Sequence, residues 1–254
     1  MIHFVGAGSG AADLITVRGS RLVNQADVII YAGSLVNPEL LEGRKPECRV
    51  YNSAKMTLEE VFQVMKEAEE QHLETVRLHT GDPCIYGAIR EQMDLLDQAG
   101  ILYDYCPGVS AFCGAASAMN LEYTLPGISQ TVIITRMAGR TPVPEKEEIE
   151  KLASHQATMV IFLSTGMLEE LSRRLIAGGY DPQTPAAIVY KATWPDEESH
   201  LCTVSTLAQC AGEHGITKTA LILVGDAVAQ TGYSRSELYH PEFTTEFRQG
   251  SKKE

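Results

Sequence analysis

Short apolar runs alternate, along the first half of the chain, with stretches in which apolar residues recur at helical spacing. The runs predict strands at Ile2 to Val5, Asp27 to Tyr31, Thr75 to His79 and Ile101 to Tyr105. Between the second and third of them, Thr57-Leu-Glu-Glu60 has the form of a capping box that begins a helix. Further helices are predicted at Ile85 to Gln98 and Ser110 to Met119. This alternation predicts a parallel sheet covered by helices.

The pattern resumes after Leu125-Pro126-Gly127. It predicts strands at Thr131 to Thr135, Thr158 to Leu163, Ala186 to Tyr190 and Ala220 to Val224, with helices near Glu145 to Leu152 and Gly166 to Ile176. We therefore predict two α/β domains that form a cleft, with the first at residues 1–122 and the second at 123–243. Residues 244–254 are polar and are expected to fray. A cleft between two such halves is the expected place for a small-molecule site.

Composition narrows the classes of function. With 44% hydrophobic and 21% charged residues, the 254-residue chain has the make-up of a folded protein. No apolar run is long enough to span a bilayer and the first strand leads straight into glycines, so the expected location is cytoplasmic. The net charge of -12 argues against nucleic acid and membrane surfaces as partners. The six cysteines form no C-x-x-C pair and no two histidines have helical ligand spacing, so we expect free thiols and no metal.

Three glycine-bearing loops each follow a predicted strand. They are Gly6-Ala-Gly-Ser-Gly-Ala11, Thr80-Gly-Asp-Pro-Cys-Ile-Tyr-Gly87 and Pro107-Gly-Val-Ser-Ala111. Ligands of open α/β sheets bind at the carboxyl ends of the strands, so the three loops predict one binding edge. Small residues and backbone amides suit an uncharged adenosine, whereas a phosphate site would call for a P-loop lysine, which is missing.

The first loop also satisfies the loose dinucleotide fingerprint G-x-G-x-x-A. A nicotinamide enzyme should carry an acidic residue at the end of its second strand, where this chain has Tyr31-Ala-Gly-Ser34. A nicotinamide-dependent reductase and a non-catalytic nucleotide-binding module therefore remain as alternatives.

The second loop holds the candidate catalytic residues, Asp82 and Tyr86. Asp82 can cap exposed amide groups, and its expected role is to orient the backbone and the cofactor rather than to remove a proton. Tyr86 could donate to a substrate or fill the start of a helix. Cys84 has no partnered base in the sequence pattern and is expected to be a small buried thiol.

Together the three loops resemble the tetrapyrrole methylase family, in which V-G-A-G-P-G-D-P, G-D-P-x-x-Y-G and P-G-V-[ST]-[SA] occur in this order. The match spans nearly the whole chain. Ser9 and Ala11-Ala12 depart from it, because they stand where the family usually has a proline and an Asp-Pro pair. Tyr31-Ala-Gly-Ser-Leu-Val36 and Thr124-Leu-Pro-Gly-Ile-Ser-Gln-Thr-Val132 are similar to the branch that methylates ring carbon C-11 of precorrin-4 or cobalt-precorrin-4.

The resemblance implies an S-adenosylmethionine-dependent C-methyltransferase of cobalamin biosynthesis, in the wider class of porphyrin biosynthesis. It implies the tetrapyrrole methylase fold, with the cofactor between the halves, a trough for the tetrapyrrole in the first domain, and a homodimer. A methylase for another precorrin or uroporphyrinogen ring carbon is the alternative. The positions that match the family's cofactor site are Ser9, Thr80, Gly81, Asp82, Ile85, Ser110, Ala111, Leu163, Ala192 and Ala220.

A precorrin carries many carboxylates, which conflicts with the negative net charge of the chain. Arginine binds carboxylates in bidentate fashion, so a few arginines at the site can bind the substrate although the chain as a whole is negatively charged. We expect Arg18, Arg136 and Arg140 to contact the substrate, and Arg21, Arg77 and Arg90 also lie in or beside predicted loops or helix starts. The alternative for each arginine is a surface pair with one of the many glutamates.

Overall fold

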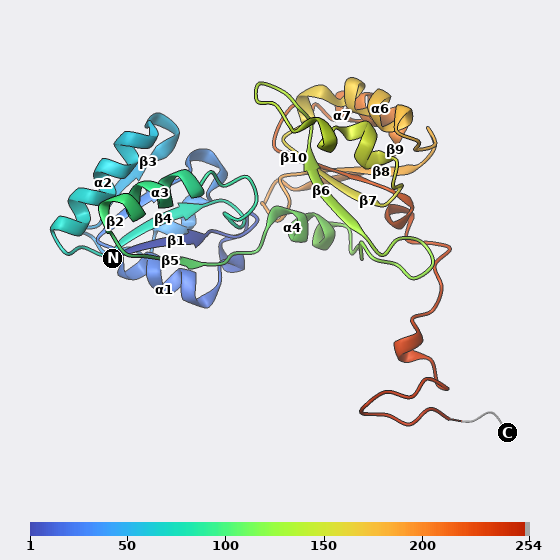
Figure 1. The fold of residues 1–254 in the computed structure, drawn as a ribbon, viewed down its shortest axis with the longest axis horizontal. Helices are drawn as coiled ribbons and strands as arrows, with labels where there is room; N and C mark the ends of the chain where they lie inside the picture. Colours follow the sequence, from blue (N-terminus) through green and yellow to red (C-terminus); the bar gives the residue numbers. More distant parts are fainter. Residues whose placement is uncertain (252–254) are drawn as a thin grey trace. The chain divides into compact units, whose positions relative to one another are not determined.

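Two compact units make up the protein, which we describe from a computed structural model covering residues 1–251. The first unit contains Met1–Ser117 together with Lys191–Glu197, and the second contains Ala118–Tyr190 and the chain from Glu198 onward (Figure 1). Residues 191–197, predicted to lie in the second domain, belong to the first unit because Thr193 Oγ1 accepts a hydrogen bond from Ala11 N (3.1 Å).

The first unit is built on five parallel strands in the order β3-β2-β4-β1-β5. Their bounds are Ile2–Gly6 for β1, Val28–Tyr31 for β2, Arg49–Asn52 for β3, Thr75–His79 for β4 and Tyr103–Cys106 for β5. The predicted parallel sheet is confirmed. In this order β4, β1 and β5 are neighbours, so the loops that follow them leave the sheet side by side.

Helices cover both faces of this sheet. They are α1 (Val17–Gln25), α2 (Leu58–Glu70) and α3 (Arg90–Ala99), with α4 (Ala111–Ala118) at the end of the unit. Helix α1 lies on one face and α2 and α3 on the other (Figure 1). The capping box of α2 is confirmed, since Thr57 Oγ1 accepts from Glu60 N and Thr57 N donates to Glu60 Oε2 (2.7 Å).

The second unit has a mixed sheet in the order β6-β7-β10-β8-β9, in which only the β6–β7 pairing is parallel. The strands are β6 (Val132–Arg136), β7 (Thr158–Phe162), β8 (Pro185–Tyr190), β9 (Glu198–Thr203) and β10 (Ala220–Val224). Its helices are α5 (Ile149–Ala153), α6 (Leu168–Ala177) and α7 (Leu207–Glu213). Buried residues of α6, including Leu171 and Leu175, pack against Ile161 and Ile222 of the sheet.

Two strands, one helix and one helix start differ from the sequence prediction. Helix α7 was not predicted, because its seven residues are too few for a clear helical pattern of apolar positions. Strands β3 and β9 were not predicted, because each is an edge strand with mostly exposed or half-buried residues and no apolar run. The predicted helix at Ile85 begins instead at Arg90, because Tyr86 (φ 57°) and Ala88 (φ 49°) lie in the left-handed region, which ends helical geometry.

The predicted frayed tail is only partly described. Within 244–251, the Arg248 guanidinium donates to the carbonyls of Leu238 (3.1 Å), His240 (2.7 Å) and Phe243 (3.2 Å). This part is therefore tied to the residues before it, whereas 252–254 lie outside the described residues. Over the described part of the chain, no helix has the length and apolarity needed to cross a bilayer.

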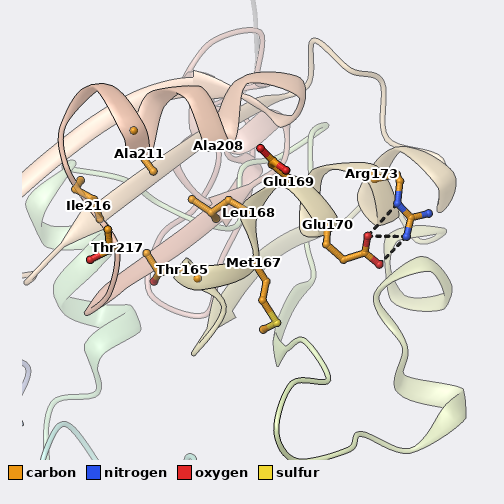
Figure 2. A pocket seen from close by; sticks show the side chains of 12 residues that line it. Thr165, Met167, Leu168, Glu169, Glu170, Arg173, Ala208, Ala211, Ile216 and Thr217 are labelled. Atoms are coloured by element: carbon orange, nitrogen blue, oxygen red, sulfur yellow. Dashed lines mark hydrogen bonds and ion pairs between the residues drawn. The ribbon is translucent and has the colours of Figure 1, made fainter.

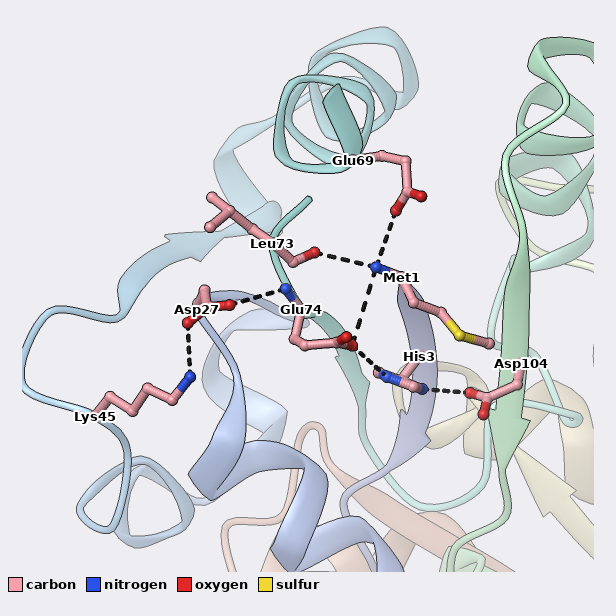
Figure 3. A network of polar contacts seen from close by, with 8 residues as sticks. All are labelled: Met1, His3, Asp27, Lys45, Glu69, Leu73, Glu74 and Asp104. Atoms are coloured by element: carbon pink, nitrogen blue, oxygen red, sulfur yellow. Dashed lines mark hydrogen bonds and ion pairs between the residues drawn. The ribbon is translucent and has the colours of Figure 1, made fainter. Parts of the chain in front are cut away.

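Charged groups join the amino ends of the strands in the first unit (Figure 3). His3 on β1 contacts Asp104 (2.6 Å) and Glu74 (3.0 Å) through its two ring nitrogens. Asp27 accepts from Lys45 Nζ (2.6 Å) and from Glu74 N (2.9 Å). The network thus lies at the edge opposite the three glycine loops, so it stabilises the sheet away from the predicted site.

Replacing Asp27 by alanine should lower the free energy of unfolding at pH 7 by about 1–2 kcal/mol, because two hydrogen bonds to a partly buried carboxylate are lost. The hydrogen bond from Lys45 is the main reason that the pKa of Asp27 lies below its ordinary value. A lowered pKa in the folded state stabilises above the unfolded pKa of about 4, and this stabilisation is lost as the pH falls through the folded value. The difference between Asp27→Ala and wild type should therefore shrink between pH 7 and about pH 2.5 in chemical denaturation. Exposed Asp13→Ala is the control; a pH-independent difference for Asp27 would contradict the prediction.

Candidate cofactor and substrate site

The three glycine loops meet at the carboxyl edge of β4, β1 and β5. Gly8 N donates to Gly81 O (3.2 Å) and Gly81 N donates to Gly8 O (2.8 Å), which makes an isolated bridge between the first two loops. Ala7 N donates to His79 O (2.7 Å) just before that bridge. The binding edge predicted from the order of the strands is therefore assembled by backbone hydrogen bonds.

The third loop closes on the first two through glycines that leave no room for a side chain. A Cβ on Gly108 would overlap the carbonyl oxygen of Gly81 and lie 2.8 Å from Gly6 Cα. Gly81 itself has φ +60°, a conformation that side chains disfavour. The three loops therefore interlock backbone against backbone, and their amides and carbonyls form the surface of the edge.

Asp82 ties the second loop to the third. Its carboxylate accepts from Gly108 N (2.8 Å), Cys84 N (2.8 Å) and the Tyr105 hydroxyl. Partial burial raises the pKa of Asp82, but these hydrogen bonds outweigh it and hold the pKa below its ordinary value. An ionised carboxylate with three protein donors is suited to orienting the loops, as predicted, and poorly suited to accepting a proton.

Two other residues of the second loop, Cys84 and Tyr86, are exposed. Cys84 is exposed, so the prediction of a buried thiol is wrong; the chain turns outward here instead of entering a helix. A hydrogen bond to Asp82 is the main reason that the pKa of Cys84 is raised, which keeps the sulfur protonated and weakly nucleophilic. Tyr86 is 46% exposed, in the turn that replaces the predicted helix start. Its catalytic role stays a prediction.

Ser9 is buried under the segment 191–197. Its hydroxyl is 3.0 Å from Thr193 Oγ1, and Asn37 Nδ2 donates to the neighbouring Gly10 O (3.0 Å). Trp194 lies so close to Gly10 that a Cβ there would be 2.6 Å from the indole nitrogen. Sequence reasoning assigned Ala192 to this site but missed Asn37, Thr193 and Trp194, which hold the first loop in place.

The remaining predicted residues of the first unit lie on the second and third loops. Ser110 is buried, and its carbonyl accepts from Cys113 N (3.0 Å) and Gly114 N (3.2 Å) in the first turn of α4. A Cβ on Gly81 would lie 3.3 Å from Ala111 N. The first unit contains eight of the predicted cofactor residues, which are Ser9, Thr80, Gly81, Asp82, Ile85, Ser110, Ala111 and Ala192.

The two other predicted cofactor residues, Leu163 and Ala220, lie in the second unit. Ile161 of β7 pairs with Ile222 of β10, and the same register places Leu163 opposite Ala220. Leu163 is 67% exposed and has φ +54°, an unusual combination for a leucine. Leu163 and Ala220 therefore lie opposite each other at the adjoining ends of β7 and β10. The apolar side chain of Leu163 is exposed to solvent there.

A hollow of about 840 Å³ begins near this edge of the second unit. Thr165, whose hydroxyl donates to Ala220 O (3.1 Å), lines it together with Leu168, Ala211 and Ile216 (Figure 2). Glu169 and Glu170 also line it, and the carboxylate of Glu170 is paired with Arg173 (2.6 Å). None of the ten predicted cofactor residues lines the hollow.

A smaller cavity of about 340 Å³ in the first unit has a charged wall. It is lined by Arg77 and His79 of β4, by Gln92 and Glu91 of α3, and by Tyr86 of the second loop. Arg77 is 6% exposed and donates to Gln92 Oε1 (2.9 Å) and Ile30 O (3.1 Å). No carboxylate among the described residues forms an ion pair with it, and burial lowers the pKa of Arg77 to about 10. The cavity therefore contains a buried arginine that forms no ion pair among the described residues, although the carboxylate of Glu91 lies elsewhere on its wall.

His79 lies beside Arg77 and is equally unusual. It is 4% exposed, and its Nε2 has no hydrogen-bond partner within the described structure. Burial, reinforced by the charge of Arg77, lowers the pKa of His79 to about 3, so the imidazole is neutral at physiological pH. A buried polar atom without a hydrogen-bond partner lowers the stability of the protein. A ligand that formed a hydrogen bond with His79 Nε2 would therefore bind more tightly.

The three arginines predicted to contact substrate differ in their surroundings. Arg136 donates to the carbonyls of Met137 (3.1 Å), Thr141 (3.2 Å) and Pro142 (2.8 Å), so it holds the loop after β6. Arg18 and Arg140 are exposed, and their contact with substrate stays a prediction.

The sequence and the fold both match known proteins. Residues 1–208 match the family of tetrapyrrole (corrin/porphyrin) methylases. The chain belongs to the tetrapyrrole methylases. It is 50% identical over 252 residues to a cobalt-precorrin-4 C(11)-methyltransferase of Methanocaldococcus jannaschii, an alignment that covers 99% of this chain and 97% of that protein.

Solved tetrapyrrole methylases share the fold. A cobalt-precorrin-4 methyltransferase superposes with a TM-score of 0.87 at 44% identity, over 89% of this chain and 95% of that one. A uroporphyrin-III C-methyltransferase of Thermus thermophilus, solved with S-adenosyl homocysteine, superposes with a TM-score of 0.74 at 24% identity, over 91% of this chain and 99% of that one. The predicted fold class is thus confirmed.

Proposed function

We propose that this tetrapyrrole methylase transfers the methyl group of S-adenosylmethionine to ring carbon C-11 of precorrin-4 or cobalt-precorrin-4 in cobalamin biosynthesis. The observation that carries the proposal is the interlocking of three glycine loops at one sheet edge in a chain of this family. The names of the relative from Methanocaldococcus jannaschii and of the solved structure with the TM-score of 0.87 both contain cobalt, so cobalt-precorrin-4 is the first substrate to test.

The residues at the edge fit a neutral adenosyl group with a zwitterionic tail. Backbone amides and carbonyls of the loops and the hydroxyls of Thr80 and Ser110 offer hydrogen bonds without a phosphate-binding lysine. When bound, S-adenosylmethionine would supply an electrophilic methyl on a sulfonium. The loops would hold this group through contacts of Gly81, Ser110 and Ala111.

Methyl transfer of this kind demands position more than acid–base chemistry. The reaction is an in-line displacement, and a conjugated macrocycle supplies its own carbon nucleophile. The residues near the edge agree with this, because Asp82 is engaged by three donors and Cys84 is kept protonated. In this proposal Asp82 positions the loops, and no residue of the second loop forms a covalent intermediate.

The cavity beside β4 supports the choice of an acidic substrate. An acetate or propionate group of the macrocycle could pair with Arg77, which forms no ion pair within residues 1–251. His79 Nε2, if it carries the ring proton, could donate to the same carboxylate. A local cation of this kind accommodates an acidic substrate despite the net charge of -12.

The expected homodimer and cytoplasmic location belong to the same proposal, and they rest on the resemblance and the sequence pattern. Sedimentation of the purified protein at two concentrations tests the dimer.

A nicotinamide-dependent reductase is disfavoured because Asp27 precedes β2 and pairs with Lys45, which leaves no acidic residue at the end of β2.

Calorimetric titration with S-adenosylhomocysteine, NADH and ATP should give heat of binding with S-adenosylhomocysteine alone. Incubation with methyl-labelled S-adenosylmethionine and either cobalt-precorrin-4 or precorrin-4, followed by carbon NMR, should place the new methyl on C-11. Methylation at another ring carbon would support the alternative of a different precorrin or uroporphyrinogen methylase. Tight binding of NADH would overturn the proposal.

A further inference from the structure

Two histidines and a glutamate that are far apart in the sequence meet on the second unit. Glu198 and His200 lie two residues apart on the edge strand β9, and His214 follows the last turn of α7. Their three potential ligand atoms all lie within 4.8 Å of one another. It is the one such group of three or more metal-ligating side chains that the described residues contain.

The contacts within this cluster are close. His200 Nε2 lies 2.9 Å from Glu198 Oε2, and the rings of His200 and His214 stack with centroids 3.5 Å apart and planes 15° from parallel. Residues i and i+2 of a strand project from the same face, which explains why Glu198 and His200 both reach His214. The sequence analysis considered only helical spacing of histidines and therefore missed the group.

We propose that Glu198, His200 and His214 bind one divalent transition-metal ion of the class that prefers imidazole, such as Zn²⁺. Zinc binds imidazole nitrogen and carboxylate oxygen at about 2.0–2.2 Å, so tetrahedral ligand atoms lie roughly 3.3 Å apart. Side-chain rotations that unstack the two rings bring the three atoms from within 4.8 Å to that separation. Solvent can supply the fourth ligand, because Glu198 and His214 are exposed.

The neighbouring thiols do not compete for the ion. Cys202 is the next residue on the same face of β9, and Cys210 lies one turn before His214 on α7. Neither sulfur belongs to the group whose ligand atoms all lie within 4.8 Å of one another. Cys210 is buried in the core of the second unit, and Cys202 packs against that core.

Metal binding at this place has a structural consequence. The ion joins the edge strand β9 to the end of α7, which are otherwise joined by the His200–His214 ring stack and by packing of Cys202 and Ala208 against the core. Because a ligand that binds only the folded state stabilises it, Zn²⁺ should raise the melting temperature of the second unit. The net charge of -12 also favours accumulation of cations near the surface.

The test is a calorimetric titration of the untagged full-length protein with ZnCl₂, paired with thermal unfolding. We expect one equivalent bound with a raised melting temperature. His200→Ala and His214→Ala should each weaken binding by about tenfold or more, since loss of even an outer-sphere partner costs that much. His155→Ala, an exposed histidine elsewhere in the unit, should leave the affinity unchanged.

Two results would overturn the proposal. One is the absence of binding at a concentration of Zn²⁺ that leaves the protein soluble. The other is binding that survives in the double variant of His200 and His214, because the ion would then lie elsewhere. His200→Asn and His214→Asn serve as a second pair that keeps a polar side chain. A loss of binding in variants that keep the wild-type melting temperature without metal is then due to the lost imidazole and not to a packing defect.

Discussion

Replacement of Gly108 by alanine should abolish binding of S-adenosylhomocysteine and destabilise the first unit by about 3 kcal/mol or more. The new Cβ would overlap the carbonyl oxygen of Gly81 and press on Gly6 Cα at 2.8 Å. Both obstacles are backbone atoms at strand ends, so neither can rotate away. The third loop would have to move off the first two, and Gly108 N would leave the Asp82 carboxylate.

Gly212→Ala is a matched control for this prediction. Gly212 lies in α7, and a Cβ there meets nothing within 4 Å. Alanine is the better helix former, so this variant should be neutral or more stable by up to about 1 kcal/mol. Calorimetry with S-adenosylhomocysteine and thermal unfolding measure both variants. A Gly108→Ala protein with wild-type affinity and melting temperature would show that the loops do not form the cofactor surface.

The parts of the fold that could be predicted depend on local signals. The capping box at Thr57 needs only residues three apart, and strand β10 is a continuous apolar run that is buried along its whole length. Strand β9 reads Glu-Ser-His-Leu-Cys-Thr, and its pairing with β8 is decided by the neighbouring strand rather than by its own composition. The helix start moved to Arg90 because the second loop doubles back, with Gly87 crowded against Pro83.

The site residues divide in the same way. Those with a local sequence signal were predicted, and those placed by contacts between distant segments were not. Parallel strands deliver their carboxyl ends to one edge, so the sequence predicts that the loops holding Gly8, Gly81 and Gly108 share that edge. That these loops meet follows from the strand order, in which β4, β1 and β5 are neighbours. Thr193 is 184 residues from Ser9, and no local pattern indicates that its hydroxyl covers that serine. Arg77 was one of several arginines in the sequence, and only its burial without a carboxylate distinguishes it from the others.

Replacement of Arg77 by methionine should raise the KM for the tetrapyrrole roughly thirtyfold, equivalent to about 2 kcal/mol for a charge-assisted carboxylate contact. Affinity for S-adenosylhomocysteine should stay unchanged, because the Arg77 guanidinium donates to Gln92 and Ile30 and to none of the three loops. The loss should persist at high salt, since a buried charge is screened much less than an exposed one.

The stability of Arg77→Met separates a substrate-binding arginine from a structural one. Methionine removes a buried charge that has no counter-ion, which offsets the two lost hydrogen bonds, so the free energy of unfolding should change by less than about 1 kcal/mol. Arg44→Met, at an exposed arginine that donates to Leu41 O, is the control and should alter neither KM nor stability.

The two measurements on Arg77→Met together decide the role of the cavity. A charge kept in a buried site without a partner costs stability, and such a cost persists in proteins where the site needs the charge for function. Arg77→Lys should recover part of the lost affinity, because it restores the charge but not the planar pair of donors. If KM stayed at the wild-type value while the protein lost several kcal/mol of stability, Arg77 would be a packing residue, and the substrate carboxylates would have to bind at exposed arginines such as Arg18 and Arg140.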